Sequence, residues 1–172
     1  MAKLLQLATN IDGPLFKLDP VLDADELENR LIYASLKLRD WIQNILPALE
    51  TFFEELDVSP AEQLDELIAT YASGLPLTFE KQFKPFFLKP FESVGDGVWY
   101  LKTADLRIFG WFAKKDSFVG VVPDTFEHVK KHNLYQGYRG EVVRFRNALP
   151  LDEPKFIPGD DPNAVISNYA FA

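Results

Sequence analysis

The sequence predicts an α+β fold in which an N-terminal helical hairpin packs on a small antiparallel β-meander with C-terminal helices. Apolar residues recur at steps of three and four between residues 23 and 74, which is the period of helices buried on one side. Three short runs rich in β-branched and aromatic residues follow between residues 98 and 122, separated by turn residues. Two more helical patterns lie between residues 124 and 149. Helices and strands grouped in this way are typical of the α+β class.

Composition and length favour one domain over residues 1–172. Hydrophobic residues make up 47% of the 172 residues and include 15 Phe, which is enough to build one core. The absence of cysteine excludes disulfides and thiolate chemistry and fits a reducing compartment. The opening apolar run is too short for a signal peptide, and no stretch approaches the roughly 18 apolar residues of a membrane span. We therefore expect a cytoplasmic protein with no membrane partner.

The first half of the chain divides into an N-terminal arm (1–22) and a helical part (23–74). Asp23 is placed to cap a long helix whose inward stripe ends near Ile45, and Pro47 should kink or restart it. The motif Ser59-Pro60-Ala61-Glu62 predicts a capping box at the start of a second helix that ends at Gly74. The core positions expected in this part are Leu31, Leu38, Ile42, Leu64 and Ile68.

The second half begins with a connector rich in Phe and Pro (75–97), which we expect to cross the sheet. The sheet and two helices follow over residues 98–149, with strands at 98–102, 106–112 and 118–122. Gly110 lies within the second strand, where a glycine indicates a bulge or a close backbone approach. The tail (150–172) contains prolines and turn residues and is expected to wrap the surface.

Residue patterns for metal or cofactor chemistry are missing from the sequence. His128 and His132 lie one helical turn apart, but no third ligand is placed with them, and Val129 occupies the position that a metalloprotease motif gives to Glu. No glycine-rich phosphate loop or nucleophile elbow occurs. Carboxylate clusters fall at predicted helix starts, exposed faces and turns, where capping or solvation explains them. We predict no metal and no cofactor.

Charge is distributed unevenly along the chain. The net charge is −8, and residues 1–90 carry 8 basic against 15 acidic side chains, whereas residues 98–149 carry 9 basic against 5 acidic ones. Cations and aromatic rings alternate in residues 98–149, a combination that can hold phosphates and stack bases. The alternative, which we favour, is that the rings are core and the cations line outer faces.

The order of elements over residues 98–149, with Val98-Trp99-Tyr100-Leu101-Lys102 followed by Leu106-Arg107-Ile108-Phe109, resembles RelE/HigB-type toxins, including phage Gp49-like proteins. The resemblance covers about a third of the chain. It implies cleavage of messenger RNA on the ribosome, with Arg107 at the scissile phosphate and Lys102 as a second basic residue. Val122-Pro123-Asp124-Thr125 stands where those toxins carry a basic segment, and the preceding half is acidic, unlike a ribosome-directed toxin.

Two functional hypotheses follow. The favoured one is a non-catalytic, acidic interaction protein of phage or mobile-element origin that binds a basic protein partner. The alternative is a metal-independent ribonuclease of the toxin type, with RNA as its partner and with Lys102 and Arg107 as catalytic residues. Exposure of these two side chains on a concave basic face would distinguish the second hypothesis from the first.

Overall fold

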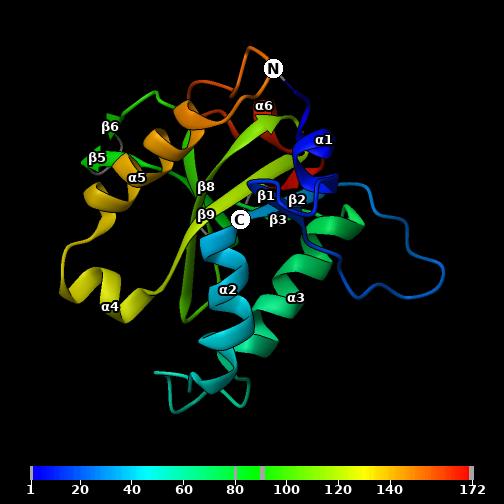
Figure 1. Cartoon of the computed structure of the whole chain (residues 1–172). Helices are drawn as coiled ribbons and strands as arrows, with labels where there is room; N and C mark the ends of the chain where they lie inside the picture. Colours follow the sequence, from blue (N-terminus) through cyan, green and yellow to red (C-terminus); the bar gives the residue numbers. More distant parts are fainter. Residues whose placement is uncertain (1, 80, 90–91, 171–172) are drawn as a thin grey trace.

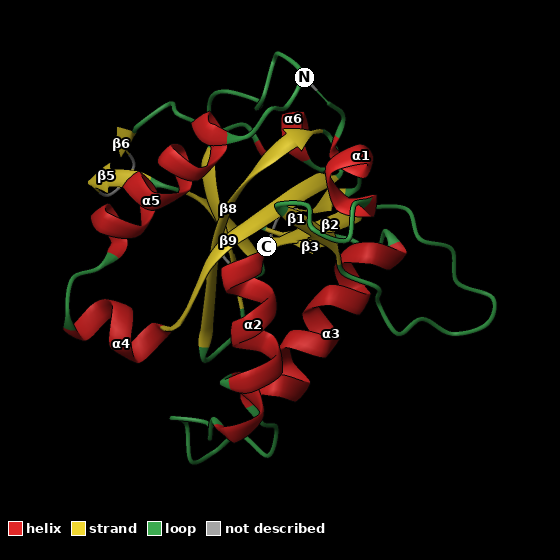
Figure 2. Ribbon diagram, in the orientation of Figure 1, coloured by secondary structure: helices red, strands yellow, loops and turns green. Residues whose placement is uncertain are grey.

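The computed structural model describes residues 2–79, 81–89 and 92–170, which form a mixed six-stranded sheet with helices on both faces (Figures 1 and 2). The strands lie in the order β1 (Leu15–Lys17), β2 (Leu31–Ser35), β9 (Ser117–Thr125), β8 (Leu106–Lys114), β7 (Val98–Lys102) and β4 (Phe83–Pro85). Strands β2 and β9 are parallel, and the other neighbouring pairs are antiparallel. The predicted α+β class is confirmed.

The predicted meander is present as β7, β8 and β9. Its rings alternate between the two faces: Trp99 and Phe112 belong to one core, and Phe109 and Trp111 belong to the other. The register between β8 and β9 shifts at Gly110, where a Cβ atom would lie 2.0 Å from the carbonyl oxygen of Val119. Gly110 therefore marks a bulge with close backbone approach, as the sequence indicates.

The long helix predicted from Asp23 is wrong. Residues 31–35 form β2, and the helix α2 covers only Leu36–Asn44, capped by the Ser35 hydroxyl, which accepts from the Leu38 amide at 3.1 Å. Because both faces of β2 are covered, apolar residues occupy successive positions and the alternation that reveals a strand is lost. Leu27, whose spacing from Leu31 fits the inward side of such a helix, is 75% exposed. The N-terminal helical hairpin is thus replaced by a strand followed by a shorter helix.

The second predicted helix is correct in position and in its caps. Helix α3 (Pro60–Ser73) begins with the capping box of Ser59 and Glu62 and ends at Gly74, which adopts a left-handed conformation. The short 3-10 helix η1 (Leu46–Ala48) and an irregular segment, 49–59, connect α2 to α3. Leu38, Leu64 and other side chains of α2 and α3 cover one face of the sheet, together with Val165 of α6 (Pro162–Val165).

Helices from both ends of the chain cover the other face. Helix α1 (Leu4–Thr9) contributes Leu4 and Leu7, and α4 (Phe126–Lys131) and α5 (Tyr135–Ala148) contribute Val129 and Val142. The Thr125 hydroxyl caps α4. Helix α5 begins at Tyr135, where the rings of Tyr135 and Tyr138 pack on Phe109 and offset the cost of Gly137 and Gly140 within the helix.

The connector and the tail also contain strands. In the connector, β4 extends one edge of the six-stranded sheet. Its other strands, β3 (Leu77–Thr78), β5 (Phe87–Lys89) and β6 (Glu92–Ser93), belong to two separate two-stranded sheets. The tail ends in β10 (Tyr169–Ala170), which pairs with β3 in parallel. The predictions for residues 90–91 of the connector and 171–172 of the tail lie outside the described residues. Within the described part of the chain, no helix has the length and apolar character needed to cross a bilayer.

Candidate functional site

Arg107, the residue on which the ribonuclease hypothesis depends, is 8% exposed. Its Nη1 atom donates to the carbonyl oxygens of Thr103 and Leu106 at 2.7 and 2.8 Å. Its guanidinium group lies over the ring of Phe126, at 4.5 Å from the centroid. Through these contacts Arg107 holds the β7–β8 turn against the start of α4. Its role is therefore structural.

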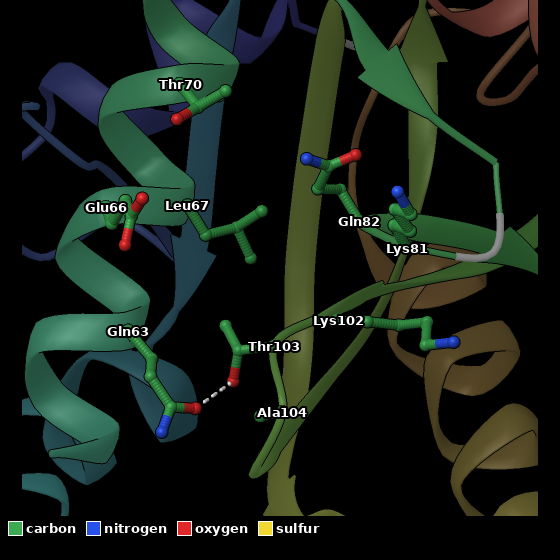
Figure 3. Close-up of a pocket in the computed structure, with 9 residues that line it drawn as sticks. All are labelled: Gln63, Glu66, Leu67, Thr70, Lys81, Gln82, Lys102, Thr103 and Ala104. Carbon is green, nitrogen blue, oxygen red and sulfur yellow. Dashed lines mark hydrogen bonds between the residues drawn. The ribbon is translucent and has the colours of Figure 1, made fainter. Parts of the chain in front are cut away.

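Lys102 is the cross-strand neighbour of Arg107 and lines a small cavity of about 240 Å³ between α3 and the ends of β7 and β4. Gln63, Glu66 and Lys81 are among the other lining residues. Figure 3 shows the Lys102 side chain running away from Gln63 and Thr103. The volume is below the roughly 300 Å³ from which small-molecule pockets start, so this hollow is too small for most organic ligands.

Other cations of the predicted basic and aromatic group also hold the fold together. Arg139 is paired with Asp96, and Arg146 donates to the Asp96 carbonyl at 2.7 Å while its guanidinium lies 3.7 Å from the ring centroid of Phe156. The rings of Trp99 and Trp111 are completely buried. These tryptophan rings are core, as expected, but Arg107 and Arg146 are buried and do not line an outer face.

His128 and His132 lie together on α4, with ring centroids 4.7 Å apart. Asp124 Oδ2 lies 2.6 Å from His128 Nδ1 and accepts a hydrogen bond from the Tyr138 hydroxyl at 2.6 Å. Burial and the bond to Asp124 raise the pKa of Tyr138. Among the described residues, no group of three or more His, Cys, Asp or Glu side chains is arranged to hold a metal ion.

The most distinctive surface is acidic. The chain contains no Lys or Arg from residue 40 to residue 80. Seven exposed carboxylates occupy the loop 49–59 and the first two turns of α3, and we call them the acidic surface: Glu50, Glu54, Glu55, Asp57, Glu62, Asp65 and Glu66. The loop projects at one end of the molecule, between η1 and α3 (Figure 1).

Apolar side chains lie exposed within the acidic surface. Phe52 is 61% exposed, and its ring meets the ring of Phe53 edge to face at 5.5 Å. Val58, near the end of the same loop, and Ile45, just before η1, are also exposed. An exposed aromatic ring surrounded by charges is typical of a surface that binds another protein.

Asp105, in the β7–β8 turn, fixes the loop 49–59 to the sheet. Although it is 3% exposed, its Oδ1 atom accepts from the Phe52 amide at 2.9 Å, and its Oδ2 atom accepts from Gln63 Nε2 at 2.5 Å. Its carbonyl oxygen accepts from the Phe126 amide at 2.6 Å. The loop, α3 and α4 thus converge on one buried carboxylate, which holds Phe52 in a defined position.

Phe52 was not predictable as a surface residue, because Leu49, Phe52, Phe53 and Leu56 have the spacing of an amphipathic helix with this ring inward. In the sequence, Asp105 has the character of an ordinary turn residue between two strands. One signal was present: a stretch of about forty residues without a cation cannot neutralise its own carboxylates. Such a stretch leaves a field that attracts basic groups.

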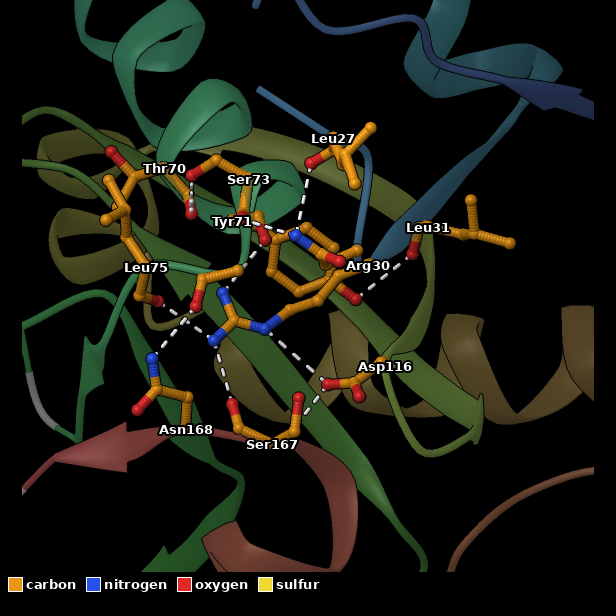
Figure 4. Close-up of polar contacts among 12 residues, drawn as sticks. Leu27, Arg30, Leu31, Thr70, Tyr71, Ser73, Leu75, Asp116, Ser167 and Asn168 are labelled. Carbon is orange, nitrogen blue, oxygen red and sulfur yellow. Dashed lines mark hydrogen bonds and ion pairs between the residues drawn. The ribbon is translucent and has the colours of Figure 1, made fainter. Parts of the chain in front are cut away.

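Arg30 forms a second buried polar centre, which serves the fold (Figure 4). The side chain is 0% exposed and lies where β2 begins. It donates to the carbonyl oxygens of Tyr71, Leu75 and Ser167 at 2.8 to 2.9 Å. Because these carbonyls come from the end of α3 with its following turn and from the tail, one guanidinium joins the start of β2 to two segments distant in the sequence.

Comparison with family models, curated proteins and solved structures finds no match for this chain. We therefore infer its function from the geometry of its own residues.

Proposed function

We propose that this chain is a non-catalytic interaction protein that binds a basic protein partner through the acidic surface. The observation that carries the proposal is the set of seven exposed carboxylates on a stretch without cations, with the exposed ring of Phe52 among them. A surface of one sign attracts an oppositely charged partner and accelerates its association. An aromatic side chain at the centre of such a surface can supply the apolar anchor that charges alone do not.

The anchoring of the loop supports this proposal. A loop that is already ordered loses less conformational entropy on binding than a flexible one. Two side-chain hydrogen bonds of Asp105 tie the loop and α3 to the sheet, so Phe52 is presented with its backbone already fixed. The loop that carries Phe52 is therefore preorganised for contact with a partner protein.

Charge reversal tests the proposal. The variant Glu54→Lys/Glu55→Lys changes the acidic surface, and Asp23→Lys/Asp25→Lys makes the same change in total charge in the loop before β2, where both side chains are exposed. Proteins captured from a native lysate by the wild type should be basic, and raised salt should release them. We expect the first variant to bind an identified partner about 1–3 kcal/mol more weakly, because each lost attraction becomes a repulsion.

The control variant should bind as the wild type does. Equal capture by the wild type and by Glu54→Lys/Glu55→Lys would contradict the proposal, as would a partner of acidic composition. Phe52→Ala adds a second measurement, since loss of an aromatic anchor should weaken binding at high salt as well as at low salt.

A further inference from the structure

A cavity of about 700 Å³ lies between α1, strands β1 and β2, the end of β8 and tail residues 151–154. In Figure 1, α1 and the loop 49–59 lie at opposite ends of the molecule, so this cavity is separate from the acidic surface. Its volume lies within the roughly 300–1,000 Å³ of small-molecule sites. The cavity is therefore large enough for a small organic molecule, unlike the hollow beside Lys102.

Leucines from three separate segments form much of the cavity wall. Helix α1 contributes Leu4 and Leu5, β2 contributes Leu31, and the tail contributes Leu151. Leu4 and Leu151 are buried, whereas Leu5 is 57% exposed. Because contact between an apolar wall and water is unfavourable, an apolar ligand that displaces this water gains binding free energy.

The charged side chains that line the cavity balance one another. Lys17 donates to Asp19 at 3.2 Å and to Glu28 at 2.7 Å, so its charge is already neutralised. The other charged residues in the lining, among those that the structure describes, are Lys3, Lys114, Asp152 and Glu153. Two ammonium groups against two carboxylates leave no surplus of either sign that would attract an ion.

We propose that this cavity binds an uncharged, mainly apolar small molecule with a hydrocarbon chain, such as an aliphatic alcohol. The chain would lie against the leucines of α1, β2 and the tail. An ion of the same length would lose part of its hydration without gaining a surplus of opposite charge, which is costly. The apolar wall and the balanced charges together favour a neutral ligand over both a fatty acid and an alkylamine. The proposal is independent of the function assigned to the acidic surface.

The test is displacement of the uncharged fluorophore N-phenyl-1-naphthylamine from the full chain. Decanol, decanoate and decylamine are compared near neutral pH, where the first is neutral and the other two carry opposite charges. Decanol should bind about tenfold more tightly than either ion, and each CH₂ group removed from the alcohol should weaken binding about fourfold. The proposal is overturned by equal or tighter binding of either ion, or by no saturable displacement with decanol below about 0.1 mM.

Variants test the wall and the charge balance separately. Leu5→Asp places a carboxylate in the wall and should abolish decanol binding, whereas Leu27→Asp, at an exposed leucine outside the cavity, should bind as the wild type does. Asp152→Asn/Glu153→Gln removes both exposed carboxylates of the lining and should strengthen decanoate binding about twofold to tenfold while leaving decanol binding unchanged.

Three results with these proteins count against the proposal. They are wild-type decanol binding by Leu5→Asp, unchanged decanoate binding by Asp152→Asn/Glu153→Gln, and a wild-type dimer that decanol dissociates. The last result would show that a second copy of the chain covers the leucines instead of a small molecule.

Discussion

Replacement of Arg30 by methionine should destabilise the fold strongly. Methionine keeps an unbranched side chain of similar length and removes every donor. In the wild type, the guanidinium donates to three carbonyl oxygens, and its Nε atom lies 3.5 Å from Asp116. The change leaves three carbonyls and one carboxylate without this partner at a fully buried position.

The expected loss is about 3–5 kcal/mol. A buried carbonyl left unpaired costs about 1–3 kcal/mol, so three would cost roughly 3–9 kcal/mol. The bonds to Leu75 and Ser167 are only partly buried, and the Tyr71 carbonyl also accepts from the Gly74 amide, which places the loss toward the lower end of this range. Part of this cost is offset, because removing the guanidinium also removes its desolvation penalty. Burial lowers the pKa of Arg30, and the nearby Asp116 carboxylate only partly opposes this shift, so the penalty is substantial. The estimate is therefore at the lower end of the sum.

Urea unfolding followed by tryptophan fluorescence measures the loss directly, because all three tryptophans can report on the core around the sheet. The matched control is Arg39→Met, which replaces a partly exposed arginine that forms an ion pair with Asp40 and lies 3.9 Å from the ring centroid of Phe16. That control should cost less than about 1 kcal/mol. An Arg30→Met variant within 1 kcal/mol of the wild type would refute the assignment of Arg30 as the link between β2, α3 and the tail.

Three further predictions follow from the core and from the candidate sites. Leu38→Ala should cost about 2–5 kcal/mol in urea unfolding, because this side chain is 1% exposed between α2 and the sheet. Chelation with EDTA should leave the melting temperature unchanged, and stoichiometric zinc in protein purified without an affinity tag would contradict this. Arg107→Ala should cost about 1–3 kcal/mol through two lost hydrogen bonds. Induced in bacteria, the wild type and this variant should both leave translation running, whereas arrest by the wild type alone would favour the ribonuclease.

The meander was predictable from the sequence, and β2 was not, for a physical reason. Strands β7, β8 and β9 follow one another along the chain and are separated by turn residues, so local signals define them. Strand β2 pairs with β9, which lies more than eighty residues later, and both its faces are covered. Its apolar positions matched the spacing of a helix by coincidence, and only the distant pairing decides between the two structures.

The partners of the two buried polar residues, Arg30 and Asp105, could not be predicted from local sequence patterns either. The partners of Arg30 lie 41, 45 and 137 residues away and are backbone carbonyls, which any residue type provides. Asp105 accepts from the backbone of Phe52 and from Gln63, which lie 53 and 42 residues earlier in the chain. The acidic character of the first half, by contrast, follows from residue counts. What the counts cannot show is that residues 49–59 form an exposed loop.

The burial of cations connects the fold to the proposed function. Arg30, Arg107 and Arg146 are buried, whereas Asp105 is the single buried carboxylate among the described residues. The exposed groups therefore carry a net charge more negative than the −8 of the whole chain. Arg107 and Arg146, two of the cations that suggested RNA binding, are buried, and Arg146 joins α5 to the distant Asp96. No Lys or Arg lies next to the carboxylates of residues 50–66 in the sequence, so their charge is not neutralised locally. Because the fold buries cations and exposes these carboxylates, it produces an acidic surface that can attract a basic partner.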